Sequence, residues 1–234
     1  AAHDSLPLPI FWLINSPGFG CLREMSVTEG DSCMDHLYLQ IWIHPRQVVR
    51  EAVLLPDKKR EWLLIVLFGL TLGLEQASIR ELGDSIPFSS ILLLSVLLSP
   101  ILGMIYWFIV SGIAYWIGRS MDGTATWRDM ETAVAWAGVP FIMKLILWVP
   151  ELAFFGEELF QSSMPSLGSN PLLFLFFIVM WLVDLVILIW YVVVLCKCVG
   201  EAHSFSAWRG LFSLLLGGLL LLLPFIVLAW FFRL

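Results

Sequence analysis

The chain has 234 residues, of which 59% are hydrophobic and only 14% are charged, and its formal net charge at neutral pH is −6. This composition, with a mean hydropathy of +0.89, excludes an ordinary soluble domain and indicates a protein whose core meets lipid. The 13 Lys and Arg residues are scattered along an acidic chain, which excludes nucleic acid as a partner because binding to phosphates requires clustered basic residues.

The N-terminal part of the chain carries no structural pattern. Residues 1–24 have no helical or strand periodicity, and they contain the turn signal Asn15-Ser16-Pro17-Gly18. We interpret residues 1–37 as a disordered segment, with residues 1–24 as sequence upstream of a natural start at Met25 or Met34.

Residues 38–61 are predicted to form a cytoplasmic segment at the membrane interface. Pro45 suits the first position of a helix that extends to Leu55, with apolar residues on one face and Arg46 and Arg50 on the other. Trp42, just before this helix, belongs to an aromatic and aliphatic run that is typical of interfacial anchors. We expect the helix to dock on the inner membrane surface or on the inner loops of the protein.

Residues 62–234 contain five stretches that are apolar enough to cross about 30 Å of hydrocarbon, which takes about 20 helical residues. The stretches are residues 62–82, 91–118, 132–154, 171–197 and 210–232. The first is the weakest, since Glu75 follows its apolar run. Pro140 is expected to kink the third near its inner end. The predicted fold is therefore all-α, a polytopic transmembrane helical bundle with five spans.

The Lys and Arg residues beside the spans predict the orientation of the bundle, because cytoplasmic loops are enriched in these residues. Nine lie on one side of the predicted membrane: Arg46, Arg50, Lys58, Lys59, Arg60, Arg119, Arg128, Lys197 and Arg209. Only Arg80 and Arg233 lie on the other. The asymmetry places the N-terminus in the cytoplasm and the C-terminus outside.

The two predicted inner loops end alike, each with a hydroxyl residue followed by Trp-Arg. The residues are Thr126, Trp127 and Arg128 in one loop and Ser206, Trp208 and Arg209 in the other. We expect the hydroxyl groups to cap the next helix and the Trp-Arg pairs to lie at headgroup level. The similarity fits an internal duplication of helical hairpins, and it fits equally the general need of a re-entering helix for a cap and an anchor.

Charged residues inside predicted spans are costly, about 3 kcal/mol each on insertion scales, and so should face protein or water. Lys144 and Asp184 lie at similar depths in the third and fourth spans, which predicts a buried ion pair between them; the alternative places them on different faces. Glu75 is a secondary polar residue that is expected to reach the outer interface near Arg80. Glu151 is interpreted as a helix-end residue.

Small residues recur at every fourth position in the first two spans, as in rows that let helix backbones approach closely. The rows are Gly69 and Gly73 in the first span and Ser95, Ser99 and Gly103 in the second. They predict tight packing within one chain or, alternatively, the face of a homo-oligomer.

Three stretches of the chain are similar to a known family. They are Ile41-Trp42-Ile43-His44-Pro45-Arg46, the loop from Gly118 to Arg128 with Ala135-Trp136-Ala137-Gly138-Val139-Pro140 after it, and His203-Ser204-Phe205-Ser206-Ala207-Trp208-Arg209. On these the chain resembles the Yip family of integral membrane proteins, over about residues 41–232. The resemblance implies five spans, a cytoplasmic N-terminus and a scaffold or adaptor role. The short N-terminal region is more similar to bacterial members, which implies a bacterial inner membrane.

The sequence contains none of the common catalytic or nucleotide-binding signatures, and its four His and four Cys residues lack metal-site spacing. We therefore predict no enzyme activity, no catalytic residue, no cofactor and no metal.

The functional hypothesis is a non-enzymatic scaffold or adaptor that contacts the lipid bilayer, a protein partner at the cytoplasmic face and, as an alternative, a second copy of itself. The predicted partner or membrane surface consists of Trp42, Pro45, Arg46, Arg50, Trp127, Arg128, Trp208 and Arg209. The alternative function is a small transporter or ion-conducting protein with a polar path through Lys144 and Asp184.

Overall fold

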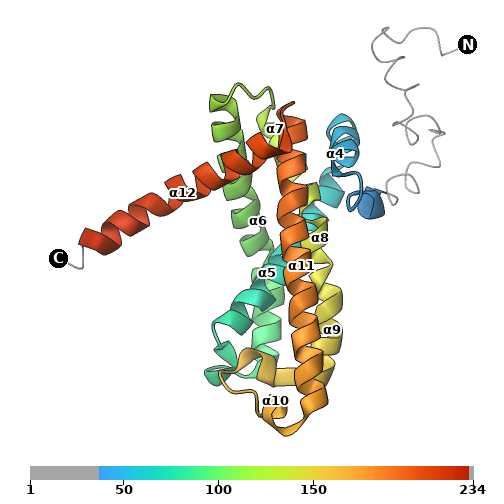
Figure 1. The fold of residues 1–234 in the computed structure, drawn as a ribbon, viewed down its shortest axis with the longest axis vertical. Coiled ribbons are helices and arrows are strands. Elements are labelled where there is room, and N and C mark those ends of the chain that lie inside the picture. The colour runs from blue at the N-terminus through green and yellow to red at the C-terminus, as the bar shows by residue number, and fades with distance from the viewer. Residues whose placement is uncertain (1–36, 232–234) are drawn as a thin grey trace, which may run out of the picture.

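The computed structural model describes residues 37–231, and the side chains of these residues apart from Ser169 and residues 224–231. The predicted segment 1–37 lies outside this range except for its last residue, as do Cys21, Cys33 and Arg233. Every regular element in the described part is helical, which confirms the all-α prediction. Figure 1 shows an elongated bundle with α4 beside one end.

The elements follow one another along the chain without a strand between residues 37 and 231. They are α4 (Pro45–Leu54), α5 (Lys58–Ile79), η1 (Leu82–Asp84), α6 (Phe88–Ser120), α7 (Trp127–Ala137), α8 (Val139–Ile142), α9 (Lys144–Phe155), η2 (Gly156–Phe160), α10 (Pro165–Ser169), α11 (Pro171–Ala202) and α12 (Ala207–Phe231).

Four helical segments in the described residues are long and apolar enough to cross a membrane: α5, α6, the segment Trp127–Phe160 and α11. They coincide with the first four predicted spans. The fifth predicted span corresponds to α12, whose described apolar part, Ala207–Leu223, is shorter than the other four. Figure 1 shows α12 leaving the bundle at a steep angle. A fifth crossing therefore stays a prediction.

The third span is interrupted near the end that is predicted to face the cytoplasm, hereafter the inner end, as the sequence predicted from Pro140. The helix breaks at Gly138, between α7 and α8, and again at Met143, between α8 and α9. Proline has no N–H to donate to the carbonyl four residues earlier, so the regular helical hydrogen bonding cannot continue through it. At the first break, the Gly138 N–H donates to the Ala135 carbonyl, three residues earlier, at 3.2 Å.

Helices α5 and α6 form the closest helix pair, through the small residues that the sequence singled out. A Cβ atom at Gly69 would overlap the backbone carbonyl of Ser99, and one at Gly103 would overlap the backbone carbonyl of Ile65. Ser95 and Ser99 are buried in the same contact. The rows are therefore used inside one chain and are not free to form the face of a homo-oligomer.

Helix α4 packs on the inner end of the bundle, against α7 and α11. Its apolar residues Val48, Val49 and Ala52 are almost completely buried there. The expected amphipathic helix is present, but its apolar face is covered by α7 and α11, a contact that the sequence pattern does not reveal. Any contact of α4 with the membrane must therefore involve its other face.

Candidate functional site

Three charged residues from three helices meet inside the bundle. The ammonium group of Lys144, at the start of α9, lies 2.8 Å from a carboxylate oxygen of Asp184 on α11 and also contacts the carboxylate of Glu75 on α5. The Lys144 side chain is only 2% exposed. Glu75 thus lies against Lys144 rather than at the outer interface with Arg80, because the rotation of α5 points it at α9.

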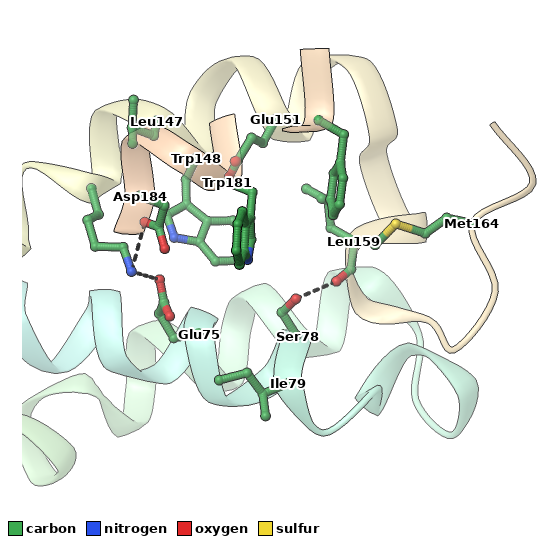
Figure 2. A pocket seen from close by; sticks show the side chains of 12 residues that line it. Glu75, Ser78, Ile79, Leu147, Trp148, Glu151, Leu159, Met164, Trp181 and Asp184 are labelled. Carbon is green, nitrogen blue, oxygen red and sulfur yellow. Dashed lines mark hydrogen bonds and ion pairs between the residues drawn. The ribbon is translucent and has the colours of Figure 1, made fainter. Parts of the chain in front are cut away.

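The three-residue group forms one end of a cleft of about 160 Å³ between α5, α9, α11 and η2. Its walls are mostly aromatic and aliphatic, and they include Trp148 and Trp181. Figure 2 shows the ion-paired carboxylates at one end of the cleft and Ser78, Leu159 and Met164 at the other. Leu159 and Met164 belong to η2 and the segment after it, so the cleft runs from the ion pair toward the outer end of the bundle.

Glu151 also lines this cleft, and sequence reasoning missed it as a member of the site. It lies within α9 rather than at a helix end. Lys144 and Glu151 are seven residues apart, and Trp148 lies between them at a spacing of four, so all three share one face of α9. The spacing is visible in the sequence and places the three residues on one face of a helix. It predicts a shared site only when that face is known to point into the bundle.

A second polar group lies at the inner end of the bundle. Glu61 on α5 is 3% exposed, and its carboxylate accepts hydrogen bonds from Arg128 at 2.6 Å and from the Thr132 hydroxyl at 2.8 Å. Glu131 accepts from the indole N–H of Trp127 at 2.7 Å and from Arg128 at 3.2 Å. Trp127 and Arg128, predicted as partner-surface residues, are thus engaged within the chain, and the buried Glu61 was missed.

The rest of the predicted partner surface divides by exposure. Trp208 is 79% exposed, and Arg46 and Arg209 are exposed as well. Arg50 is exposed, but its guanidinium donates to Glu201 on α11 at 2.9 Å. Pro45 and Trp42 are buried and half-buried, respectively. Figure 1 shows α4, α7 and the start of α12 at the same end of the bundle.

His203 joins the two inner loops. Its ring lies against Gly118 and Gly123, positions where a Cβ atom would overlap the imidazole, and it stacks on Phe205 with 5.1 Å between ring centroids. The Nε2 atom is 3.0 Å from the Ala114 carbonyl oxygen, so this nitrogen carries the proton. Burial lowers the pKa of His203. The neutral ring is therefore the form that fits this position.

The two polar groups are separated by an aromatic layer. On α5, Glu61, Phe68 and Glu75 recur every seven residues, about 10 Å of helix apart, and so share one face. Phe68 packs on Tyr106 at 4.4 Å and on Phe141 at 4.6 Å between ring centroids. The hydroxyls of Tyr106 and Tyr191 are hydrogen-bonded to each other. Apolar rings thus stand between the inner carboxylate and the outer cleft.

The comparison with protein families identifies the chain. The Yip1 domain matches residues 39–231. Searches of curated proteins and of solved structures find no significant match. The matched region includes every helix from α4 to α12, and with them the four helical segments that are long and apolar enough to span a membrane. The chain therefore belongs to the Yip1 domain family and is an integral membrane protein.

Proposed function

We propose that this Yip1-domain protein is a non-enzymatic scaffold or adaptor, and that it binds a protein partner through the inner end of its bundle. The observation that carries the proposal is the exposure of Arg46, Trp208 and Arg209 at one end of the molecule. Exposed Trp and Arg residues are enriched where proteins bind one another, because they combine a large apolar area with directed hydrogen bonds.

The same end is proposed to face the cytoplasm of a bacterium whose inner membrane holds the protein. Nine Lys and Arg residues lie beside the inner ends of the helices, whereas Arg80 lies after α5 at the other end. This distribution is the one that cytoplasmic loops favour. It leaves the N-terminus inside and, if α12 crosses the membrane, the C-terminus outside.

The partner surface proposed here is smaller than the one that sequence patterns suggested. Arg128 and Trp127 are engaged with Glu61 and Glu131, so they would hold the inner loops in place rather than contact a partner. Arg46, Trp208 and Arg209 remain for direct contact. Arg50 would contribute through the part of its guanidinium that Glu201 does not occupy.

The test is a comparison of co-purifying proteins, quantified by mass spectrometry after extraction in mild detergent. A variant that carries Arg46→Glu and Arg209→Glu should retain at least tenfold less of a specific partner protein than the wild type does. Arg80→Glu is the matched control, since it makes the same change at an exposed arginine of the opposite end. If both variants retain the same proteins, the inner surface does not bind a partner.

A second candidate function, movement of a small solute or ion, is favoured by the charged cleft between α5, α9 and α11. Charged residues inside membranes commonly mark substrate or ion pathways. The aromatic layer argues against an open conduit, because Phe68 and Phe141 stand between the cleft and Glu61. Flux into proteoliposomes that depends on Asp184 would support transport, and its absence for a range of cations and anions would leave the adaptor role.

A further inference from the structure

We propose that the cleft between α5, α9, α11 and η2 binds a small organic cation through an ammonium group, and that Glu151 is its counter-ion. The proposal does not depend on the adaptor role, which concerns the opposite end of the bundle. It rests on the balance of charge in the cleft, on the nature of its walls and on its volume.

The charges that line the cleft do not cancel. Lys144 is its one basic residue, whereas Glu75, Glu151 and Asp184 are acidic. The Lys144 ammonium is already engaged with Glu75 and Asp184. Glu151 forms no hydrogen bond or ion pair with any residue that the structure describes. An excess of negative charge inside a membrane is costly, so the cleft favours a positively charged occupant.

The placement of the carboxylates favours an organic cation over a metal ion. No three His, Cys, Asp or Glu residues within the described range lie close enough together to hold a metal. Figure 2 shows the Glu151 carboxylate apart from those of Glu75 and Asp184, and beside the Trp148 and Trp181 rings. Indole faces attract ammonium groups through their quadrupoles, and the attraction is larger where water is excluded. The cleft therefore offers one carboxylate and two indoles to the same cation.

The volume limits the size of the ligand. About 160 Å³ is smaller than the 300 to 1,000 Å³ that is typical of sites for drug-sized molecules. It suits an ammonium group with a few carbon atoms. Two sources share this chemistry: an amine dissolved in the outer aqueous phase, and the primary ammonium of an aminophospholipid headgroup.

The first experiment measures thermal unfolding of the full chain in a non-ionic maltoside detergent, with increasing propylammonium chloride. Ionic strength is kept constant with sodium chloride, so that only the cation changes. We expect a saturable rise in the unfolding temperature, because a ligand that binds the folded state stabilises it. Glu151→Gln should weaken the apparent affinity by about tenfold or more, since it replaces the carboxylate beside the ammonium with a neutral amide.

Glu157→Gln is the matched control, because Glu157 is exposed, lies six residues from Glu151 and does not line the cleft. It should leave the affinity for propylammonium unchanged. Glu151 has no partner in the described part of the chain, so its replacement should not prevent folding. The proposal would be overturned if the two variants had equal apparent affinities for propylammonium, or if propylammonium gave no saturable rise in the unfolding temperature of the wild type. Stabilisation by acidification alone would overturn it as well, because it would mean that protons neutralise the carboxylates.

The second experiment separates the two sources. The same titration is made in nanodiscs of phosphatidylglycerol, with and without phosphatidylethanolamine. If the aminophospholipid weakens the apparent affinity for propylammonium in the wild type, the lipid headgroup occupies the cleft. If the affinity is unchanged, the ammonium comes from a dissolved amine. Both outcomes agree with a cleft that binds an ammonium group, provided that Glu151→Gln lowers the apparent affinity for propylammonium in the first experiment.

Discussion

Arg128 and Glu61 form an ion pair of 2.6 Å that joins α7 to α5 at the inner end of the bundle. Glu61 is almost completely buried, whereas the Arg128 side chain is 38% exposed. The pair therefore connects the buried interior with the loop surface. The Trp127-Arg128 sequence resembles a surface anchor, but through this ion pair it holds α7 against α5.

Arg128→Gln is expected to destabilise the protein by about 2 kcal/mol, because it leaves a buried carboxylate with only the Thr132 hydroxyl as a partner. The loss should be smaller than for a fully buried pair, since Arg128 is partly solvated. Unfolding in detergent, followed by circular dichroism, measures it. Arg209→Gln, at an exposed arginine in the corresponding position of the other loop, should change stability little. Equal losses for the two variants would contradict the structural role of Arg128.

Lys144→Leu is expected to destabilise by about 3 to 5 kcal/mol, because it strands two carboxylates, Glu75 and Asp184, inside the bundle. Lys144→Leu with Asp184→Leu should recover only part of the loss, since Glu75 still lacks its ion-pair partner. Adding Glu75→Gln should recover more. Thermal melts of the single, double and triple variants provide the measurement. Strictly additive losses across the series would show that the three residues do not interact.

His203 predicts a loss of stability in acid. Its folded-state pKa is lowered by burial, so the unfolded chain binds the proton more tightly than the folded one. The contribution of His203 to the free energy of unfolding is therefore complete above about pH 6.5, the pKa of histidine in an unfolded chain. It is lost as the pH falls below that value. His203→Gln should reduce the fall in melting temperature between pH 7.5 and pH 5.5.

His44→Gln is the control for this prediction, because it makes the same substitution at an exposed histidine. Glu51, whose pKa is raised by burial, acts in the opposite direction and stabilises the fold as the pH falls. The contribution of His203 is thus measured as the difference in melting temperature between the wild type and His203→Gln at each pH. A difference that does not vary with pH would show that the imidazole does not titrate between the two states.

Gly69→Ala is expected to destabilise by about 2 to 3 kcal/mol, since the added Cβ would overlap the Ser99 backbone of α6 and force the two helices apart. Gly218→Ala is the matched change in α12, where a Cβ atom meets open space. It should be neutral or stabilising, because alanine favours helix over glycine by about 1 kcal/mol. Denaturant or thermal unfolding of the two variants tests the difference, and a neutral Gly69→Ala would mean that α5 and α6 are not in close contact.

The proposed orientation predicts which loops react with a membrane-impermeant thiol reagent. In a variant whose four native cysteines are replaced by alanine, Ser163→Cys should be labelled from outside intact cells. Ser120→Cys should be labelled only after permeabilisation. Both serines are exposed and lie at opposite ends of the bundle. The reverse labelling pattern would invert the topology.

The sequence by itself determined the elements that depend on local chemistry. Long stretches rich in apolar residues predicted α5, α6 and α11 near the positions that the structure gives them. Thr126 caps α7 by accepting the Asp129 N–H at 3.3 Å, and Asn170 caps α11 by accepting the Leu172 N–H at 3.0 Å. Pro140 interrupts the third span because of its missing N–H. Each of these outcomes depends on residues within one or two helical turns.

Only the tertiary structure decided which polar residues meet and which apolar faces are covered. Lys144 and Asp184 could be matched by depth, but the addition of Glu75 depends on the rotation of α5, and that of Glu151 on the inward face of α9. In a helix that is apolar on all sides, periodicity does not reveal this rotation, because lipid and protein interior are equally apolar. Side-chain packing sets the rotation instead, as where Gly69 allows the backbone of α6 to approach α5.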